Sequence, residues 1–251
     1  MEQTTLHYAK LIDIADRRGA GYFVLIDPDA KQVNELQSFT RQICEGDADA
    51  ILIGGSLLIH AQYDEKVRVI KEAASIPVIL FPGSLRQLSK HADAVLYLSL
   101  ISGRNPNYLI SDQVLGAPLI KRMQIEPIPT GYMLMESGRT TAAQFMSNTR
   151  PIPIDKPDIA MAHALAAQYL GMRFIYLEAG SGAEYPVPPE MIQAIAEFVD
   201  IPVIVGGGIR SPAEARKRVN AGASFLVTGN VLEKSENEHL IREFADAVHV
   251  G

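Results

Sequence analysis

The chain has 251 residues, of which 47% are hydrophobic and 21% are charged, as in ordinary soluble globular proteins. Its net charge of −6, without a basic cluster, argues against nucleic-acid binding, and no apolar run approaches the ~18 residues needed to span a bilayer. The mixed-charge N-terminal segment is not a signal peptide, so we expect a cytoplasmic protein that is at most peripheral to a membrane. The single cysteine, Cys44, excludes an intramolecular disulfide, and we expect it to be a packed core thiol in a helix.

Eight short apolar runs follow one another along the chain, and most end in glycine, serine, asparagine or a carboxylate. Near-continuous apolar runs are typical of parallel strands that are covered on both faces. The predicted strands are Tyr22–Pro28, Ala50–Ser56, Pro77–Gly83, Asp93–Leu100, Ile125–Met135, Phe174–Gly180, Pro202–Gly208 and Ser224–Asn230.

Helical periodicity separates most of these runs. After the third run, residues 84–92 are too few for much more than two turns. Ser102–Pro118 and Ser137–Asp155 are expected to be irregular, and loops of this length are often lids or oligomer contacts. The spacing predicts helices over Gln32–Glu45, Asp64–Ala74, Lys156–Leu170, Pro189–Val199 and Pro212–Ala221.

Strand–helix alternation repeated eight times, with right-handed crossovers, predicts a closed (β/α)₈ or TIM barrel, whose typical length is ~250 residues. DADAILIGGS followed by IPVILFPGS resembles GMRFIYLEAGS followed by IPVIVGGGI four strands later, which suggests duplicated half-barrels. We predict a single domain over residues 1–251, with its functional site at the C-terminal ends of the strands.

The strongest chemical signal is Gly206–Glu214 (GGGIRSPAE), after the seventh run. Its three glycines let the backbone approach an anion. Ser211 then predicts a helix N-cap, Pro212 the first helical residue, and Glu214 a capping box. The eighth run ends in TGN at residues 228–230, which adds a second glycine loop. Glycines can simply turn the chain, but glycine loops after strands seven and eight together favour a phosphate site.

Tyr176 and Glu178 alternate with Leu177 at the end of the sixth run, so both should point towards the barrel mouth. A carboxylate that faces a barrel interior is costly unless it binds something. Glu178 is therefore a candidate to accept hydrogen bonds from substrate hydroxyls or to act as a general base. The alternative is a solvated glutamate at a strand end.

Asp27, near the end of the first run, is a candidate Mg²⁺ ligand, because Mg²⁺ prefers one or two carboxylates with waters and substrate phosphates. Ser56, on the neighbouring strand, could add an oxygen ligand. The residues alone support a helix-cap or turn role for Asp27 nearly as well. A paired DDxxD aspartate box is absent from the sequence.

Six motifs in order (IDPD, IGGS, GYMLMESG, YLEAGSGA, GGGIRSPAEA and VTGN) resemble those of the geranylgeranylglyceryl phosphate synthase family, and the resemblance covers nearly the whole chain. The loops look closest to the larger archaeal and bacterial branch. The resemblance implies a prenyltransferase in which the 3-hydroxyl of sn-glycerol 1-phosphate attacks C1 of geranylgeranyl diphosphate, forming an ether and releasing diphosphate.

The resemblance also implies roles for individual residues. Asp27 and Ser56 would bind Mg²⁺, and the catalytic residues would be Glu178, which orients the glycerol hydroxyls and takes the proton, and Tyr176. The residues implied to bind glycerol phosphate are Tyr176, Leu177, Glu178, Ala179, Gly180, Ser181, Gly182, Gly207, Gly208, Gly229 and Asn230.

The diphosphate and the prenyl tail need further groups. Arg104, Lys121 and Arg210 are candidate phosphate or diphosphate partners. Family precedent implies a homo-oligomer, a dimer or a hexamer, and a lipid substrate suggests transient contact with a membrane surface. Candidate residues for an apolar prenyl groove are Tyr97, Tyr108, Leu109, Ile110, Tyr132 and Met133.

Two rival functions stay open. A phosphoribosyl isomerase or synthase barrel would use the same glycine loops, but it needs a paired acid and base on strands one and five. The fifth run offers Pro129, Thr130 and Tyr132 and no carboxylate at its core. The other rival is a non-catalytic phosphate-binding barrel that serves as a scaffold or sensor, and the presence of Asp27, Ser56 and Glu178 argues against it.

Overall fold

The strands close into one barrel. The computed structural model describes residues 6–59, 62–233, 237 and 239–251. In this part of the chain eight parallel strands pair in chain order, and β8 pairs with β1, which confirms the predicted (β/α)₈ architecture. The strands are β1 (Gly21–Ile26), β2 (Ala50–Ile53), β3 (Val78–Leu80), β4 (Ala94–Leu100), β5 (Glu126–Leu134), β6 (Phe174–Glu178), β7 (Val203–Gly206) and β8 (Phe225–Thr228).

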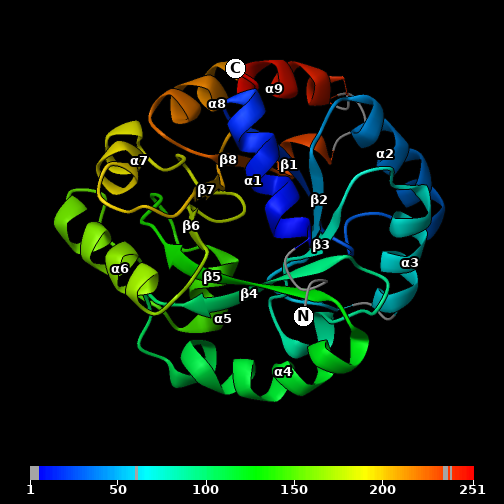
Figure 1. Cartoon of the computed structure of the whole chain (residues 1–251), viewed down its shortest axis with the longest axis horizontal. Helices are drawn as coiled ribbons and strands as arrows, with labels where there is room; N and C mark the ends of the chain where they lie inside the picture. The colour runs from blue at the N-terminus through cyan, green and yellow to red at the C-terminus, as the bar shows by residue number, and fades with distance from the viewer. Residues whose placement is uncertain (1–5, 60–61, 234–236, 238) are drawn as a thin grey trace.

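Helices form an outer layer around the strands, as Figure 1 shows. The five predicted helices are present, with ends within three residues of those expected. The helices are α1 (Leu6–Arg18), α2 (Val33–Glu45), α3 (Tyr63–Ala73), α4 (Asp112–Met123), α5 (Ala142–Ser147), α6 (Pro157–Tyr169), α7 (Pro189–Ala196), α8 (Pro212–Asn220) and α9 (Leu240–Val248).

The expectation of irregular structure over Ser102–Pro118 was wrong. A π-helical turn, η3 (Asn107–Ser111), leads directly into α4, and the shorter helix α5 occupies part of the second stretch. Pro118 inside α4 is a residue that normally interrupts helices, and the apolar residues of α4 do not form one core-facing stripe. The exposed ones are Val114, Leu115 and Leu119, whereas the buried residues are Gly116 and Ile120.

Side chains alternate between the barrel interior and an outer layer beneath the helices. Tyr176 belongs to the interior cluster, whereas Leu177 belongs to the outer one. This confirms that Tyr176 and Glu178 share the interior side of β6. Large residues of the interior cluster include Phe23, Leu52, Leu96, Ile128, Phe174, Ile204 and Phe225.

α1 lies across the N-terminal end of the barrel (Figure 1). Leu11 is fully buried with the interior cluster. The carboxylate of Glu126, at the start of β5, accepts hydrogen bonds from the amides of His7 (2.7 Å) and Tyr8 (3.1 Å). Glu126 is only 4% exposed. Its buried carboxylate satisfies two amides of the first turn of α1 and interacts favourably with the positive end of the α1 dipole.

β3 and β4 are joined without a regular helix. The connection holds only the 3₁₀ turn η2 (Leu85–Gln87), in line with its shortness. Gln87 is buried; its Nε2 donates to the Gly55 carbonyl (2.7 Å) and its Oε1 accepts from the Gly55 amide (3.1 Å). The turn is thus fixed to the end of β2, and the outer face of β4 has no crossover helix of its own to cover it.

The structure also bears on the expectations for Cys44 and for membrane-spanning segments. Cys44 is half-buried on α2, so the prediction of a packed core thiol was wrong. Among the described residues, no helix combines the length and the apolar character needed to cross a bilayer.

The contact between Glu126 and α1 predicts a stability effect. Glu126→Ala should lower the free energy of unfolding by about 1–3 kcal/mol, because two first-turn amides lose a buried charged acceptor. Glu126→Gln, which keeps one acceptor oxygen, should lose less. Chemical denaturation measures both against Glu45→Ala, an exposed residue on α2. Equal losses for Glu126→Ala and Glu45→Ala would show that the docking of α1 does not depend on this carboxylate.

Candidate functional site

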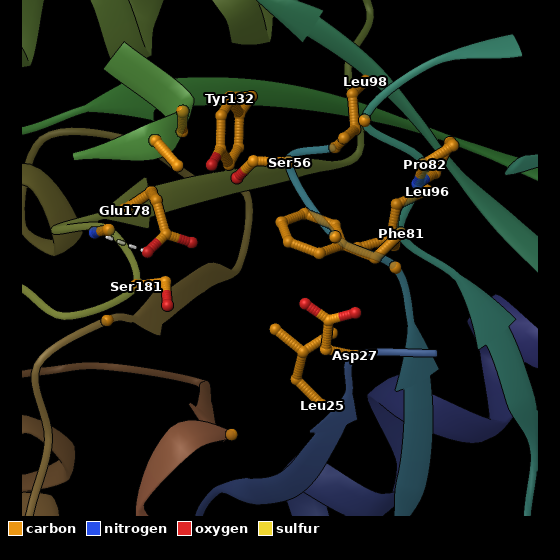
Figure 2. Close-up of a pocket in the computed structure, with 18 of the residues that line it drawn as sticks. Leu25, Asp27, Ser56, Phe81, Pro82, Leu96, Leu98, Tyr132, Glu178 and Ser181 are labelled. Atoms are coloured by element: carbon orange, nitrogen blue, oxygen red, sulfur yellow. Dashed lines mark hydrogen bonds between the residues drawn. The ribbon is translucent and has the colours of Figure 1, made fainter. Parts of the chain in front are cut away.

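One cavity of about 880 Å³ opens at the C-terminal ends of the strands. In Figure 2, Asp27 and Glu178 reach into the same hollow, and the ring of Phe81 lies across the hollow from Glu178, above Asp27 in this view. Most of the predicted site residues are brought together here. Those that line the cavity are Asp27, Ser56, Tyr97, Tyr108, Tyr132, Tyr176, Glu178, Gly180, Ser181, Gly182, Gly207, Gly208, Arg210, Gly229 and Asn230.

Glu178 is a buried carboxylate at the centre of this site. It is 6% exposed, and its Oε1 accepts a hydrogen bond from the Gly180 amide at 2.6 Å. Burial raises the pKa of Glu178 to about 7, although the Gly180 amide and the hydroxyls of Tyr176 and Tyr132 each lower it in part. A carboxyl with this pKa exchanges a proton readily near neutral pH, which suits a general base.

Two tyrosines flank the Glu178 carboxylate. Burial, and then the charge of Glu178, raise the pKa of both Tyr132 and Tyr176 well above the ordinary value, so both stay protonated and can donate. The Tyr176 hydroxyl is buried and has no hydrogen-bond partner with good geometry in the described part of the chain. A buried donor without a partner is costly, which marks this position as one where a ligand oxygen would be favourable.

The end of β7 must be glycine for this arrangement to fit. A Cβ on Gly206 would lie 2.4 Å from the Tyr176 hydroxyl. Gly207 has φ +86°, and a Cβ there would lie 2.5 Å from both Glu178 Oε1 and the Gly180 amide nitrogen. The amides of Gly207 and Gly208 donate to no protein acceptor within the described residues, so they are available to an anion.

α8 begins directly after these glycines, as predicted. Ser211 is its N-cap and accepts from the Glu214 amide (3.3 Å), and Pro212 is the first helical residue. The predicted capping box is altered, because the Glu214 carboxylate accepts from the Arg210 amide (2.7 Å) instead of from the N-cap amide. The residues directly before α8, from Gly207 to Arg210, line the cavity, so the positive end of the α8 dipole lies close behind them.

The loops after β6 and β8 meet across the cavity. The Ser181 hydroxyl donates to the Asn230 side-chain oxygen (2.9 Å), and the Asn230 amide donates to Glu233 (3.1 Å). Arg210 also lines the cavity, but its guanidinium donates to the carbonyls of Ala183 and Glu184. The Arg210 guanidinium therefore links the loop after β7 to the loop after β6, and these bonds occupy donors that would otherwise be available to an anion.

Asp27 and Ser56 lie in the cavity on the side of β1 and β2. Asp27 Oδ1 accepts from the Asp29 amide (2.8 Å), and Gly55 lies directly against the carboxylate. Burial and the neighbouring Asp29 raise the pKa of Asp27, whereas the Asp29 amide and Lys66 lower it. No set of three or more His, Cys, Asp or Glu in the described residues is arranged to hold a metal. A single carboxylate that needs substrate phosphates and water to complete its ligand set still fits Mg²⁺.

An apolar branch of the cavity runs along the uncovered outer face of β4. Tyr97 and Tyr108 line it as predicted, and their hydroxyls donate to the carbonyls of Gln113 (2.5 Å) and Met146 (3.2 Å). The phenol rings thus face apolar neighbours while their polar ends are satisfied. Other lining residues of this branch are Leu85, Leu88, Val95, Gly116, Ile120 and Met146.

Among the lining residues that the sequence analysis did not name are an aromatic residue and a cation beside the polar part of the cavity. Phe81 stacks on Tyr176 (centroids 4.9 Å apart) and meets Tyr132 edge-on (5.8 Å), which makes an aromatic wall beside Glu178. Arg86, in η2, is an exposed cation on the rim. The position of Phe81 near the end of the third predicted strand, Pro77–Gly83, was the available signal, since every strand end of a barrel faces the site. No sequence signal distinguishes Arg86.

Several predicted residues do not line the cavity. The Leu177 and Ala179 side chains pack in the outer layer, and the Ala179 amide donates a hydrogen bond to the Gly206 carbonyl (3.0 Å), so it is not available to a ligand. Arg104 is turned towards His163 and the Gly103 carbonyl. Lys121 lies in the last turn of α4, at the far end of the barrel. Of the remaining groove candidates, Met133 is buried in the outer layer, Ile110 is exposed, and Leu109 is half-buried outside the lining.

Comparison with known proteins shows the family to which this chain belongs. The model of the PcrB family matches residues 12–248. A geranylgeranylglyceryl phosphate synthase from Chitinophaga pinensis is 46% identical over 239 residues, covering 94% of each chain. One from Thermococcus kodakarensis is 47% identical over 234 residues, covering 92% of this chain and 91% of the relative.

A solved structure agrees with these relatives. The geranylgeranylglyceryl phosphate synthase of Thermoplasma acidophilum, in complex with its substrate sn-glycerol 1-phosphate, superposes with a TM-score of 0.90 at 35% identity. The match covers 95% of this chain and 96% of that one. The family model matches nearly the full length of this chain, and the two relatives are 46% and 47% identical to it. The chain therefore belongs to the PcrB family and, within it, to the geranylgeranylglyceryl phosphate synthases.

Proposed function

We propose that the protein transfers a geranylgeranyl group from geranylgeranyl diphosphate to the 3-hydroxyl of sn-glycerol 1-phosphate. The observation that carries this proposal is that the glycine loops and the apolar branch open into one cavity, with Glu178 and its two tyrosines next to both. The products are 3-O-geranylgeranyl-sn-glyceryl 1-phosphate and diphosphate.

The glycerol phosphate half lies at the ends of β6, β7 and β8. The amides of Gly207 and Gly208 and the N-terminus of α8 hold the phosphate, with Ser181 and Asn230 alongside. A glycerol hydroxyl then lies against Glu178 and accepts from Tyr176, whose buried hydroxyl has no good partner in the described part of the chain. Fixing the phosphate positions the 3-hydroxyl for attack, and Glu178 takes its proton.

The diphosphate half lies on the side of β1 to β3. Asp27, with Ser56, would hold Mg²⁺ through its carboxylate, and Arg86 on the rim is a candidate partner for the diphosphate. When bound, Mg²⁺ would stabilise the negative charge of the departing diphosphate as a Lewis acid. The prenyl tail lies in the apolar branch between β4 and α4.

The phosphoribosyl isomerase is the weaker enzymatic candidate. The one carboxylate of β5, Glu126, lies at the start of the strand and accepts from amides of α1, whereas Ile128, Thr130 and Tyr132, further along the strand towards the cavity, offer no carboxylate to pair with Asp27. A non-catalytic barrel would have no need to keep Glu178 buried, because a buried carboxylate costs stability.

The surroundings of the enzyme form part of the proposal. We expect it to act in the cytoplasm as a homo-oligomer, a dimer or hexamer, with transient contact with a membrane surface that receives its lipid product. Flotation with liposomes, with and without prenyl diphosphate, tests the contact; a protein that never co-migrates with the liposomes contradicts it.

Product formation tests the reaction directly. Labelled sn-glycerol 1-phosphate is incubated with C15, C20 and C35 prenyl diphosphates, with Mg²⁺ or with EDTA. We expect an ether product that is largest with C20, that requires Mg²⁺ and that is absent with the 3-phosphate enantiomer. Glycerol phosphate binding without product from any diphosphate would favour the non-catalytic reading.

Replacing the base should slow the reaction more than it weakens binding. Glu178→Gln is expected to lower kcat by about 10²–10⁴-fold, because the amide cannot take the proton. Glycerol 1-phosphate affinity, measured by calorimetry, should fall less than about tenfold, since the backbone amides that hold the phosphate are unchanged. Glu190→Gln, on the exposed first turn of α7, is the control. A Glu178→Gln enzyme with near wild-type kcat would remove the assigned base.

Filling the apolar branch should shorten the accepted tail. A Cβ on Gly116 would already lie 2.9 Å from Leu85 Cδ2, so Gly116→Leu must project into the groove. We expect the rate with the C20 diphosphate to fall at least about tenfold, whereas the rate with the C10 diphosphate should stay close to that of the wild type. Val114→Leu, on the exposed face of the same helix, should leave the chain-length profile unchanged. An unaltered profile in Gly116→Leu would place the tail elsewhere.

A further inference from the structure

Lys66 is a buried lysine that the proposed reaction does not use. It lies in the first turns of α3 and is only 6% exposed. Lysines are rarely buried to this extent unless their charge is paired, because desolvation of an ammonium is costly. Its Nζ donates to the carbonyl oxygen of Pro28, the residue directly after Asp27. A charged group is therefore held beneath the loop that carries the candidate metal ligand.

The loop above Lys66 is crowded with negative charge. Asp29 acts on Asp27 as a like charge, and Asp27 in turn acts on Glu233. Two lysines oppose these charges: Lys31 acts on Glu233, and Lys66 acts on Asp27. Lys66 is the more buried of the two, so its interaction is the less screened by water.

The Asp27 carboxylate is also fixed by geometry. Its Oδ1 accepts from the Asp29 amide (2.8 Å), and Asp29 Oδ2 accepts from the Ile59 amide (2.7 Å) in the loop after β2. Gly55 lies against the carboxylate from the side of β2. The bond from Lys66 to Pro28 adds a support from α3, so the loop is held from two neighbouring elements.

We propose that Lys66 is a positioning residue that acts as the internal counter-ion of Asp27 while no divalent cation is bound. Through its bond to Pro28 it holds the residue that follows Asp27, and its charge balances that of the nearby carboxylate. The inference rests on the proposed binding of Mg²⁺ at Asp27. Because the lysine already balances one negative charge, Mg²⁺ alone, without diphosphate, gains little electrostatic binding energy at this site. The ion then binds mainly together with the diphosphate, whose oxygens supply the missing negative charge.

The test compares charge with hydrogen bonding at one position. Lys66→Gln keeps a donor and loses the charge, Lys66→Arg keeps the charge, and Lys71→Gln on the same helix is the matched control. Lys71 pairs with Asp93 (2.7 Å), away from the cavity. The melting temperature of each full-length variant is measured at one pH without Mg²⁺ and along an MgCl₂ titration.

We expect Lys66→Gln to lower the melting temperature without Mg²⁺ by about 2–4 °C, and the rise caused by Mg²⁺ to be at least about double that of the wild type. Its half-saturating Mg²⁺ concentration should fall by about threefold or more, because the ion now supplies all of the balancing charge. Lys66→Arg should resemble the wild type. Lys71→Gln should melt earlier with an unchanged Mg²⁺ response.

A second arm covers severe destabilisation of Lys66→Gln. The double variant Asp27→Asn/Lys66→Gln removes both charges and should recover most of the stability lost without Mg²⁺, as a double-mutant cycle requires for coupled groups. An equal Mg²⁺ response in Lys66→Gln and wild type, or no recovery in the double variant, overturns the counter-ion role. If neither the wild type nor Lys66→Gln responds to Mg²⁺, the metal is removed from the proposed function, and the inference falls with it.

Discussion

The Glu178 carboxylate is removed from water at the mouth of the barrel, and much of the surrounding structure serves to hold it there. Burial raises its pKa to about 7, and one backbone amide and two phenols compensate in part. Those partners impose further constraints. Tyr176 fits only because residue 206 has no side chain, and Gly180 can approach the carboxylate only because residue 207 has none. The glycines that bind the phosphate in our proposal are thus also required by the base.

The second constraint is the missing helix between β3 and β4. In a regular barrel a crossover helix would cover this part of the sheet. Here η2 is fixed to β2 through Gln87, and an apolar branch of the cavity takes the space beside β4. α4 closes that branch from outside with Gly116 and Ile120, which leaves its other apolar residues exposed. The same irregularity that makes the barrel imperfect gives it room for a long apolar chain.

The sequence predicted the fold well because parallel strands covered on both faces carry a strong apolar signal. It also predicted Glu178 and Tyr176 from their alternation with Leu177, because a strand has a strict period of two. It failed where position depends on packing. α4 was missed because few of its apolar residues face the core, and Lys121 was misplaced because a long loop hid which end of a helix it occupies. The contact of Phe81 with Tyr176 and the burial of Lys66 become recognisable only when neighbouring elements are brought together.

The pH dependence of kcat/KM for sn-glycerol 1-phosphate tests most directly whether Glu178 is the base, because this parameter reports ionisations of the free enzyme and free substrate. The account predicts that the wild-type value falls with one proton as the pH drops through about 7, where protonation removes the base. In Glu178→Gln that limb should vanish from the residual activity, leaving only ionisation of the substrate phosphate near pH ~6. The same limb near 7 in both enzymes would contradict the account and assign the titration to another group.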